Sequence, residues 1–217
     1  MPPTLILIRH AQALHNVDRK YHLHDPDLSE LGFEQLKPLR QNLMVHPLAQ
    51  NAGLIVTSPM RRTIQTTLGS VDWLIAKGIK VEADADWQGE EFPVVDFSSL
   101  DPVYPDKSTP AGSRYAYNKK VLLARGQSAL QKLYNRPEKV IIVVSHSGFL
   151  RECVSGWWYF NSDYRIFDFE ERASDDQPYS LKQSAETFEN GGGLGLSHKH
   201  EVGLGGGLPH ESLANAE

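Results

Sequence analysis

Cysteine is almost absent, since Cys153 is the only one among 217 residues. A single thiol excludes an intrachain disulfide, and such chains are typical of reducing compartments rather than of secretion. Long apolar runs are absent too. The run Leu5–Ile8 is followed at once by Arg9 and His10, whereas a signal peptide needs a longer run and a membrane helix needs about 20 apolar residues. We therefore expect a cytoplasmic protein with no membrane segment.

Runs of basic residues are also missing. The formal net charge is −5 and the isoelectric point is about 6.0. Such a chain creates no field that would draw it to nucleic acid or to anionic lipid, so neither is predicted as a partner. The length and the 40% content of hydrophobic residues predict one core and one main domain.

Short apolar segments predict a sheet. Continuously apolar, β-branched runs are typical of strands buried on both faces of a parallel sheet. The strand candidates are Leu5–Ile8, Leu54–Val56, Ile79–Val81 and Val140–Val144.

Helical patterns fill the connections between these strands. One helix is predicted after Ser58, which can cap it, and apolar residues then recur at helical spacing from Ile64 to Ile75. A second begins near Ser29, and Pro38 should interrupt it unless it bends or restarts there. A third covers about 118–134. Alternating strands and helices predict an α/β fold in which helices cover both faces of a mostly parallel sheet.

The composition changes after residue 171. Eight of the 17 glycines fall between Gly191 and Gly207. Ordering so much glycine costs entropy that few large apolar side chains are present to offset. The sequence therefore predicts a catalytic domain over residues 1–171 and a glycine-rich, flexible tail over 172–217.

Three polar motifs follow predicted strands. The first is Arg9-His10-Ala11-Gln12, with Asn16 six residues beyond His10; the second runs from Ser58 to Thr66 and includes Arg62; the third is His146-Ser147-Gly148. Each motif alone has an ordinary structural explanation, such as a solvated arginine. In a parallel sheet, however, ligands bind beyond the carboxyl ends of the strands, so the three motifs should meet. Two histidines and two arginines at one place predict a site for a phosphoryl group.

These motifs together resemble the signature of the histidine phosphatase (phosphoglycerate-mutase-like) superfamily, and small fungal members look most similar. The resemblance spans about residues 3–170. It implies a three-layer, Rossmann-like α/β fold, no metal or organic cofactor, and a small phosphorylated substrate. It also makes His10 the nucleophile that is phosphorylated, while Arg9, Arg62 and His146 bind the phosphoryl group. The pocket would be completed by Asn16, Gln12, Ser147 and Gly148.

The acid that protonates the leaving oxygen is harder to place. Members of the superfamily carry a glutamate after the third strand, and alignment puts Gly89 there. The chain reads as if a segment were missing between Gln88 and Glu90. Either Glu90 or Glu91 could take the place of that acid; we choose Glu90 because it is nearest, with Asp84 and Asp86 in reserve.

Three other functions remain open. A phosphoglycerate-mutase-like phosphotransferase would need a closed pocket that excludes water, and the apparent shortening argues against one. A protein that lacks the acid could bind phosphorylated ligands without turning them over. Finally, histidines that alternate along the chain can share a metal, although solvated loop histidines are the simpler explanation. His15, His22 and His24 cluster near the start of the chain, and His198 and His200 form an alternating pair in the tail. The oligomeric state and the substrate cannot be read from the sequence.

Overall fold

The computed structural model describes residues 1–17, 23, 25–87 and 119–208. Within them the chain forms a six-stranded sheet of order β3-β2-β4-β1-β5-β6. The strands are β1 (Thr4–Arg9), β2 (Leu54–Thr57), β3 (Lys80–Ala83), β4 (Val140–Ser145), β5 (Tyr164–Phe169) and β6 (Leu181–Gln183). The first four strands along the chain pair in parallel, and β5 and β6 add an antiparallel edge. The predicted, mostly parallel sheet is confirmed.

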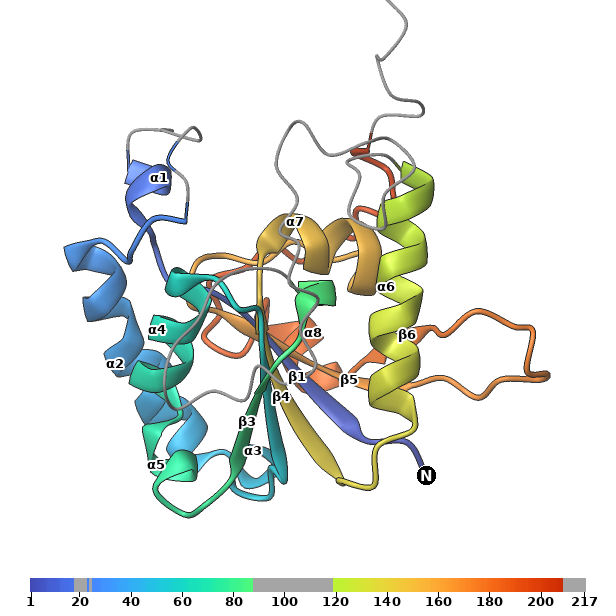
Figure 1. Cartoon of the computed structure of the whole chain (residues 1–217), viewed down its shortest axis with the longest axis horizontal. Helices are drawn as coiled ribbons and strands as arrows, with labels where there is room; N and C mark the ends of the chain where they lie inside the picture. The colour runs from blue at the N-terminus through green and yellow to red at the C-terminus, as the bar shows by residue number, and fades with distance from the viewer. Residues whose placement is uncertain (18–22, 24, 88–118, 209–217) are drawn as a thin grey trace, which may run out of the picture.

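Helices cover both faces of this sheet (Figure 1). They are α1 (Leu14–Val17), α2 (Glu30–Val45), α3 (Pro47–Gln50), α4 (Arg61–Ser70), α5 (Asp72–Ile75), η1 (Ala85–Trp87), α6 (Lys119–Tyr134), α7 (Ser147–Phe149), η2 (Leu150–Ser155) and α8 (Ala185–Asn190). Alternate side chains of β1 explain the layers. Leu5 and Leu7 pack with α6 and η2, whereas Ile6 and Ile8 pack with α2 and α4. A buried strand thus supplies two cores, as its continuous apolar run predicts.

The helix signals are only partly correct. The helix predicted to begin near Ser29 does so, and Ser29 caps α2 by accepting a hydrogen bond from the Gly32 N–H. Pro38 lies inside α2 without interrupting it, because tertiary packing holds the helix on both sides of the proline. Ser58 does not cap α4; the helix begins at Arg61, and Met60 occupies the cap position without a side-chain bond. Ser58 is therefore available for another contact.

The glycine-rich segment differs from the flexible tail that the sequence predicts. As far as residue 208 it folds back on the core. The buried carboxylate of Asp163 accepts hydrogen bonds from the Leu194 and Leu196 N–H groups and from the Ser197 hydroxyl. A Cβ on Gly193 would lie 1.9 Å from the Tyr164 ring, so glycine is needed there for close approach. A buried anion that organises backbone N–H groups offsets the entropy that composition alone suggests.

The carboxyl ends of β1, β2 and β4 meet at one edge of the sheet. Parallel pairing places Arg9 opposite Ser145, and Thr57 opposite Val144. Helices α1 and α7 lie at this edge in Figure 1. The three polar motifs are therefore brought together, as predicted.

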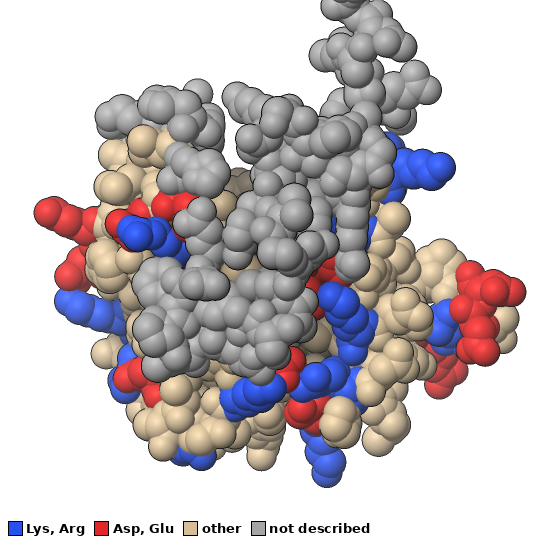
Figure 2. Space-filling view, in the orientation of Figure 1, with Lys and Arg blue, Asp and Glu red and all other residues tan. Residues whose placement is uncertain are grey.

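The surface charge and the lengths of the helices can be compared with the prediction that the chain binds neither nucleic acid nor a membrane. On the face drawn in Figure 2, basic and acidic side chains are interspersed, and acidic groups gather on the β5–β6 loop at the right. Glu171, Asp175 and Asp176 of this loop are exposed. Among the described residues, every helix is too short or too polar to cross a membrane.

Candidate active site

His10 follows β1 and is 3% exposed. The backbone N–H of His10 donates to the Ser145 carbonyl at 2.9 Å, and this hydrogen bond fixes the backbone of His10 against β4. The ring Nδ1 lies 2.6 Å from the Ala11 carbonyl oxygen. A carbonyl can only accept, so Nδ1 carries the proton and Nε2 keeps a lone pair. Burial, followed by the charges of Arg62 and Arg9, holds the pKa of His10 well below its usual value. The ring is therefore a neutral nucleophile at neutral pH.

Two arginines lie beside this ring. Arg9 donates from Nη1 to the Tyr159 carbonyl at 2.8 Å. Arg62 stands in the first turn of α4, its side chain 12% exposed, and its Nη1 lies 3.5 Å from Oδ1 of Asp25. Burial lowers the pKa of Arg62 to about 10, so it remains charged at neutral pH. A guanidinium in a helix's first turn adds to the field of the helix N-terminus, which itself favours anions.

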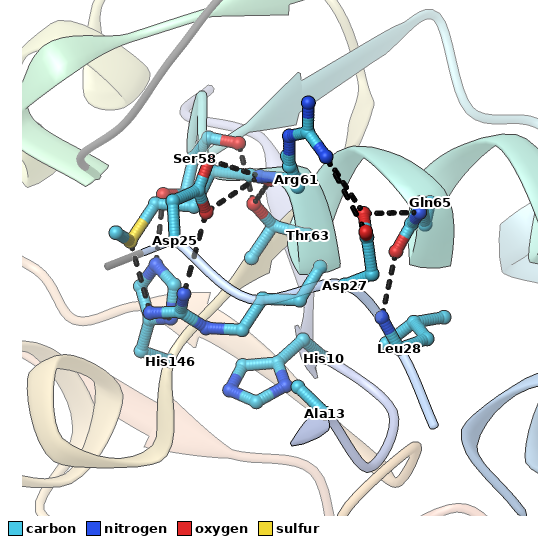
Figure 3. Close-up of polar contacts among 12 residues, drawn as sticks. His10, Ala13, Asp25, Asp27, Leu28, Ser58, Arg61, Thr63, Gln65 and His146 are labelled. Carbon is cyan, nitrogen blue, oxygen red and sulfur yellow. Dashed lines mark hydrogen bonds and ion pairs between the residues drawn. The ribbon is translucent and has the colours of Figure 1, made fainter. Parts of the chain in front are cut away.

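His146 completes the cluster from the end of β4. Its ring centroid lies 5.3 Å from that of His10. Nε2 of His146 is 2.8 Å from the Ser58 hydroxyl, and Nδ1 is 3.3 Å from Nη2 of Arg62. Figure 3 shows His146 and His10 on the same side of the network that holds α4. Two rings and two guanidiniums thus converge, and together they can bind a dianionic phosphoryl group.

An acidic loop holds the start of α4. The Asp25 carboxylate accepts from the Arg61 N–H at 2.9 Å, and Asp27 accepts from the Gln65 amide at 2.9 Å (Figure 3). Asp25 has a φ of 42°, in the left-handed region. A strained backbone near a site is retained when the surrounding contacts determine it. Asp25 therefore fixes both the helix end and Arg62, and no pattern in the sequence pointed to it.

A cavity of about 380 Å³ opens over these groups. Most of the predicted site residues line it: Arg9, His10, Asn16, Arg62, His146, Ser147 and Gly148. It is also lined by Arg125, Arg151 and Glu152, which sequence reasoning missed. Arg125 had a readable signal, because it lies three residues after Leu122 and four before Ala129, on the stripe that periodicity assigns to the interior. A charge on that stripe is a functional hint.

The other predicted residues have different surroundings. Gln12 does not line the cavity; its amide oxygen accepts from the Ser29 hydroxyl at 2.7 Å. Glu90 lies outside the described residues. The reserve acids Asp84 and Asp86 both pair with Lys132, at 2.8 and 2.9 Å, and neither lines the cavity. These two carboxylates therefore stabilise the packing of α6 near η1.

The histidines considered as metal ligands are dispersed. His15 lines the cavity, whereas the His198 ring packs on Trp158 at 4.5 Å. His22 and His24 lie outside the described residues. Within the part of the chain that the structure describes, no three His, Cys, Asp or Glu side chains are placed to hold a metal ion.

The three cavity histidines should make stability depend on pH. Burial lowers the pKa of His10, His15 and His146, in the case of His15 to about 4. An unfolded histidine titrates near pH 6.5, so the unfolded chain binds more protons below that pH. We expect the free energy of unfolding to be highest with respect to these three histidines above about pH 6.5, and to fall as the pH drops toward 4. Urea unfolding followed by tryptophan fluorescence would measure this.

A matched variant separates these histidines from the carboxylates. His15→Gln removes one of the three titrations, so its curve should be flatter between pH 6.5 and 4 than that of the wild type. Inorganic phosphate should also oppose the loss, because a bound anion favours the protonated rings. Identical slopes for the two proteins would contradict the depressed pKa of His15.

Comparison with known proteins identifies one family, and relatives of this chain carry names from the same family. The family model described as "Histidine phosphatase superfamily (branch 1)" matches residues 5–169. "Phosphoglycerate mutase-like protein 1" of Arabidopsis thaliana is 29% identical over 197 residues, with 68% of this chain and 69% of that protein covered. "Phosphoserine phosphatase 1" of Hydrogenobacter thermophilus is 27% identical over 192 residues, with 77% and 87% covered.

Solved structures share the fold. A phosphoserine phosphatase variant from Entamoeba histolytica, in complex with phosphoserine, aligns with a TM-score of 0.53 at 19% identity, covering 84% of this chain and 97% of that one. A mycobacterial glucosyl-3-phosphoglycerate phosphatase aligns with a TM-score of 0.51 at 19% identity, covering 84% and 98%. At such identities the likeness establishes the fold.

Proposed function

Because the chain belongs to the histidine phosphatase superfamily (branch 1), we propose that it hydrolyses a small phosphorylated metabolite through a phosphohistidine on His10. The observation that carries this proposal is the hydrogen bond between Nδ1 of His10 and the Ala11 carbonyl, which leaves Nε2 as the nucleophile beside two arginines. Relatives named as phosphatases support the same reaction class.

The first step transfers the phosphoryl group. Nε2 of His10 forms a bond to phosphorus while the bond from phosphorus to the ester oxygen breaks, and the leaving oxygen takes a proton from an acid. Arg9, Arg62 and His146 bind the three remaining oxygens, and donors that are already in place stabilise the charge that develops on these oxygens without having to reorganise. In the second step the conjugate base of that acid takes a proton from water as the water oxygen attacks phosphorus, the P–N bond breaks, and inorganic phosphate and neutral His10 are released.

The substrate is proposed to be a small molecule. The cavity, at about 380 Å³, is of the size of small-ligand sites and can hold an organic group besides the phosphoryl group. The guanidinium of Arg125, over the Phe149 ring at 4.9 Å, adds positive charge to the cavity wall. We also propose that the protein is cytoplasmic and needs no metal or organic cofactor.

A phosphotransferase is the second candidate, favoured by the relatives named as phosphoglycerate-mutase-like. It would return the phosphoryl group from His10 to another hydroxyl rather than to water. The third candidate, a protein that only binds phosphorylated ligands, applies if no acid protonates the leaving oxygen. Release of inorganic phosphate with steady turnover separates hydrolysis from both.

Hydrolysis of a panel of phosphomonoesters tests the proposal, with Glu90→Gln testing the acid. General acid catalysis contributes about 10²- to 10⁴-fold, and alkyl esters need it more than p-nitrophenyl phosphate, whose leaving group is a weak base. We expect Glu90→Gln to lower kcat on alkyl phosphates by about 10²-fold or more, and on p-nitrophenyl phosphate far less.

The neighbouring Glu91→Gln is the matched control and should leave both activities within a fewfold of wild type. Equal losses on both substrate types would exclude Glu90 as the proton donor. Absence of turnover on every ester in the wild type would refute hydrolysis itself.

A further inference from the structure

The Ser58 hydroxyl has a contact that the proposed steps have not used. Ser58 is fully buried, with 0% exposed. Its N–H donates to the Val144 carbonyl at 2.9 Å, and its own carbonyl accepts from the hydroxyls of Thr63 and Thr57, at 2.6 and 3.0 Å. The backbone is thus held on both sides. Its Oγ lies 2.8 Å from Nε2 of His146, in a position that the fold fixes before any ligand arrives.

The partners of His146 determine which ring nitrogen carries the proton. Arg62 can only donate, and its Nη2 lies 3.3 Å from Nδ1 of His146. Nδ1 must therefore accept in the ligand-free protein. A neutral imidazole has one N–H, which is then on Nε2 and donates to the Ser58 hydroxyl.

We propose that Ser58 is a positioning residue for His146: its hydroxyl accepts the Nε2–H, so that Nδ1 is the nitrogen that meets the phosphoryl group. This inference rests on the proposed function. When a phosphomonoester binds, its oxygens are stronger acceptors than the ring and take over the Arg62 donors. His146 then takes up one proton at Nδ1 from solvent, and this N–H donates a hydrogen bond to a phosphoryl oxygen while the Nε2–H continues to donate to the Ser58 hydroxyl.

The charges around His146 explain why an acceptor at Nε2 matters. The groups that face it are Arg9, His10, His15, Arg62 and Arg125, together with the ion pair of Arg151 and Glu152. Burial, then Arg62 and His10, lower the pKa of His146 in the empty cavity. A bound dianion opposes these charges, but a half-buried imidazolium still needs both N–H groups satisfied. Within the described residues, Ser58 supplies the acceptor for Nε2–H.

Nuclear magnetic resonance on the wild-type protein tests this directly. Long-range ¹H–¹⁵N spectra of the ¹⁵N-histidine-labelled chain, with His146 assigned by comparison with His146→Asn, report which nitrogen is protonated. We expect Nε2–H without ligand and protons on both nitrogens with saturating inorganic phosphate. An Nδ1–H tautomer in the empty protein would overturn the proposal, and that result does not depend on the catalytic activity of any variant.

Kinetics of Ser58→Ala supply the second readout. Loss of a hydrogen bond to a charged group should lower kcat about 10- to 100-fold and shift the alkaline limb of the kcat profile down by about one pH unit. Ser58→Thr keeps the hydroxyl and should restore the limb.

The control is Ser70→Ala, which removes another fully buried hydroxyl, bonded to the Thr66 carbonyl at 2.6 Å and remote from His146. Its profile should match wild type, whereas a shift equal to that of Ser58→Ala would refute the positioning role. If the wild type gave the expected ¹H–¹⁵N spectra of His146 but hydrolysed no phosphomonoester, the proposed hydrolysis would be refuted. The positioning of His146 by Ser58 would still hold.

Discussion

His10→Ala should abolish hydrolysis, lowering kcat by at least about 10⁴-fold on every phosphomonoester. The variant has no atom in the place of Nε2, so the phosphoryl group cannot be held covalently and water would have to attack the substrate directly. Transition-state binding by Arg9, Arg62 and His146 is expected to leave a small residual rate. Steady-state release of inorganic phosphate measures the loss.

A covalent readout accompanies the kinetic one. Acid quenching destroys a phosphohistidine, so the wild type is quenched in base after mixing with ³²P-labelled substrate and the protein-bound label is counted. Label should appear on wild type and be absent from His10→Ala. His46→Asn is the control, because His46 contacts Glu186 away from the cavity and should label normally. Retained label on His10→Ala would place the nucleophile elsewhere.

Arg62→Lys should lower kcat/KM about 10²- to 10³-fold, and Arg62→Ala should lower it further. Lysine keeps the charge but loses the planar fork that binds two phosphoryl oxygens at once. The Ala variant also removes a positive charge. Burial is the largest cause of the low pKa of His10, and the charge of Arg62 is the next largest. That pKa should rise, so the acidic limb of kcat/KM should move to higher pH, with activity lost first below about pH 6.5.

Arg61→Lys is the matched control. Arg61 precedes Arg62 on α4, is about half exposed, and pairs with Asp27 at 3.3 Å. Its kcat/KM should stay within about threefold of wild type, because an exposed ion pair contributes little. Because lysine keeps the charge, equal losses in Arg62→Lys and Arg61→Lys would mean that a change in the packing of α4, rather than lost contact with the phosphoryl group, lowers the activity. An Arg62→Ala profile with an unmoved acidic limb would contradict its influence on His10.

The sequence determined the parallel part of the fold and the core of the site. Apolar runs such as Leu5–Ile8 can be strands only if both faces are covered, and polar residues that follow such strands must gather at one edge. Both rules are local, so Arg9, His10, Arg62 and His146 could be placed together before any coordinates. The family resemblance added their roles.

Tertiary structure decided the rest, because it depends on contacts between segments far apart in the chain. Ser58 has the local pattern of a helix cap, yet its hydroxyl meets His146, which lies 88 residues away. The glycine-rich segment reads as flexible, yet the buried Asp163 organises its backbone as far as Leu196. Composition and periodicity report what a residue favours among its neighbours; which distant donor or acceptor it meets is settled only when the sheet brings the strand ends together.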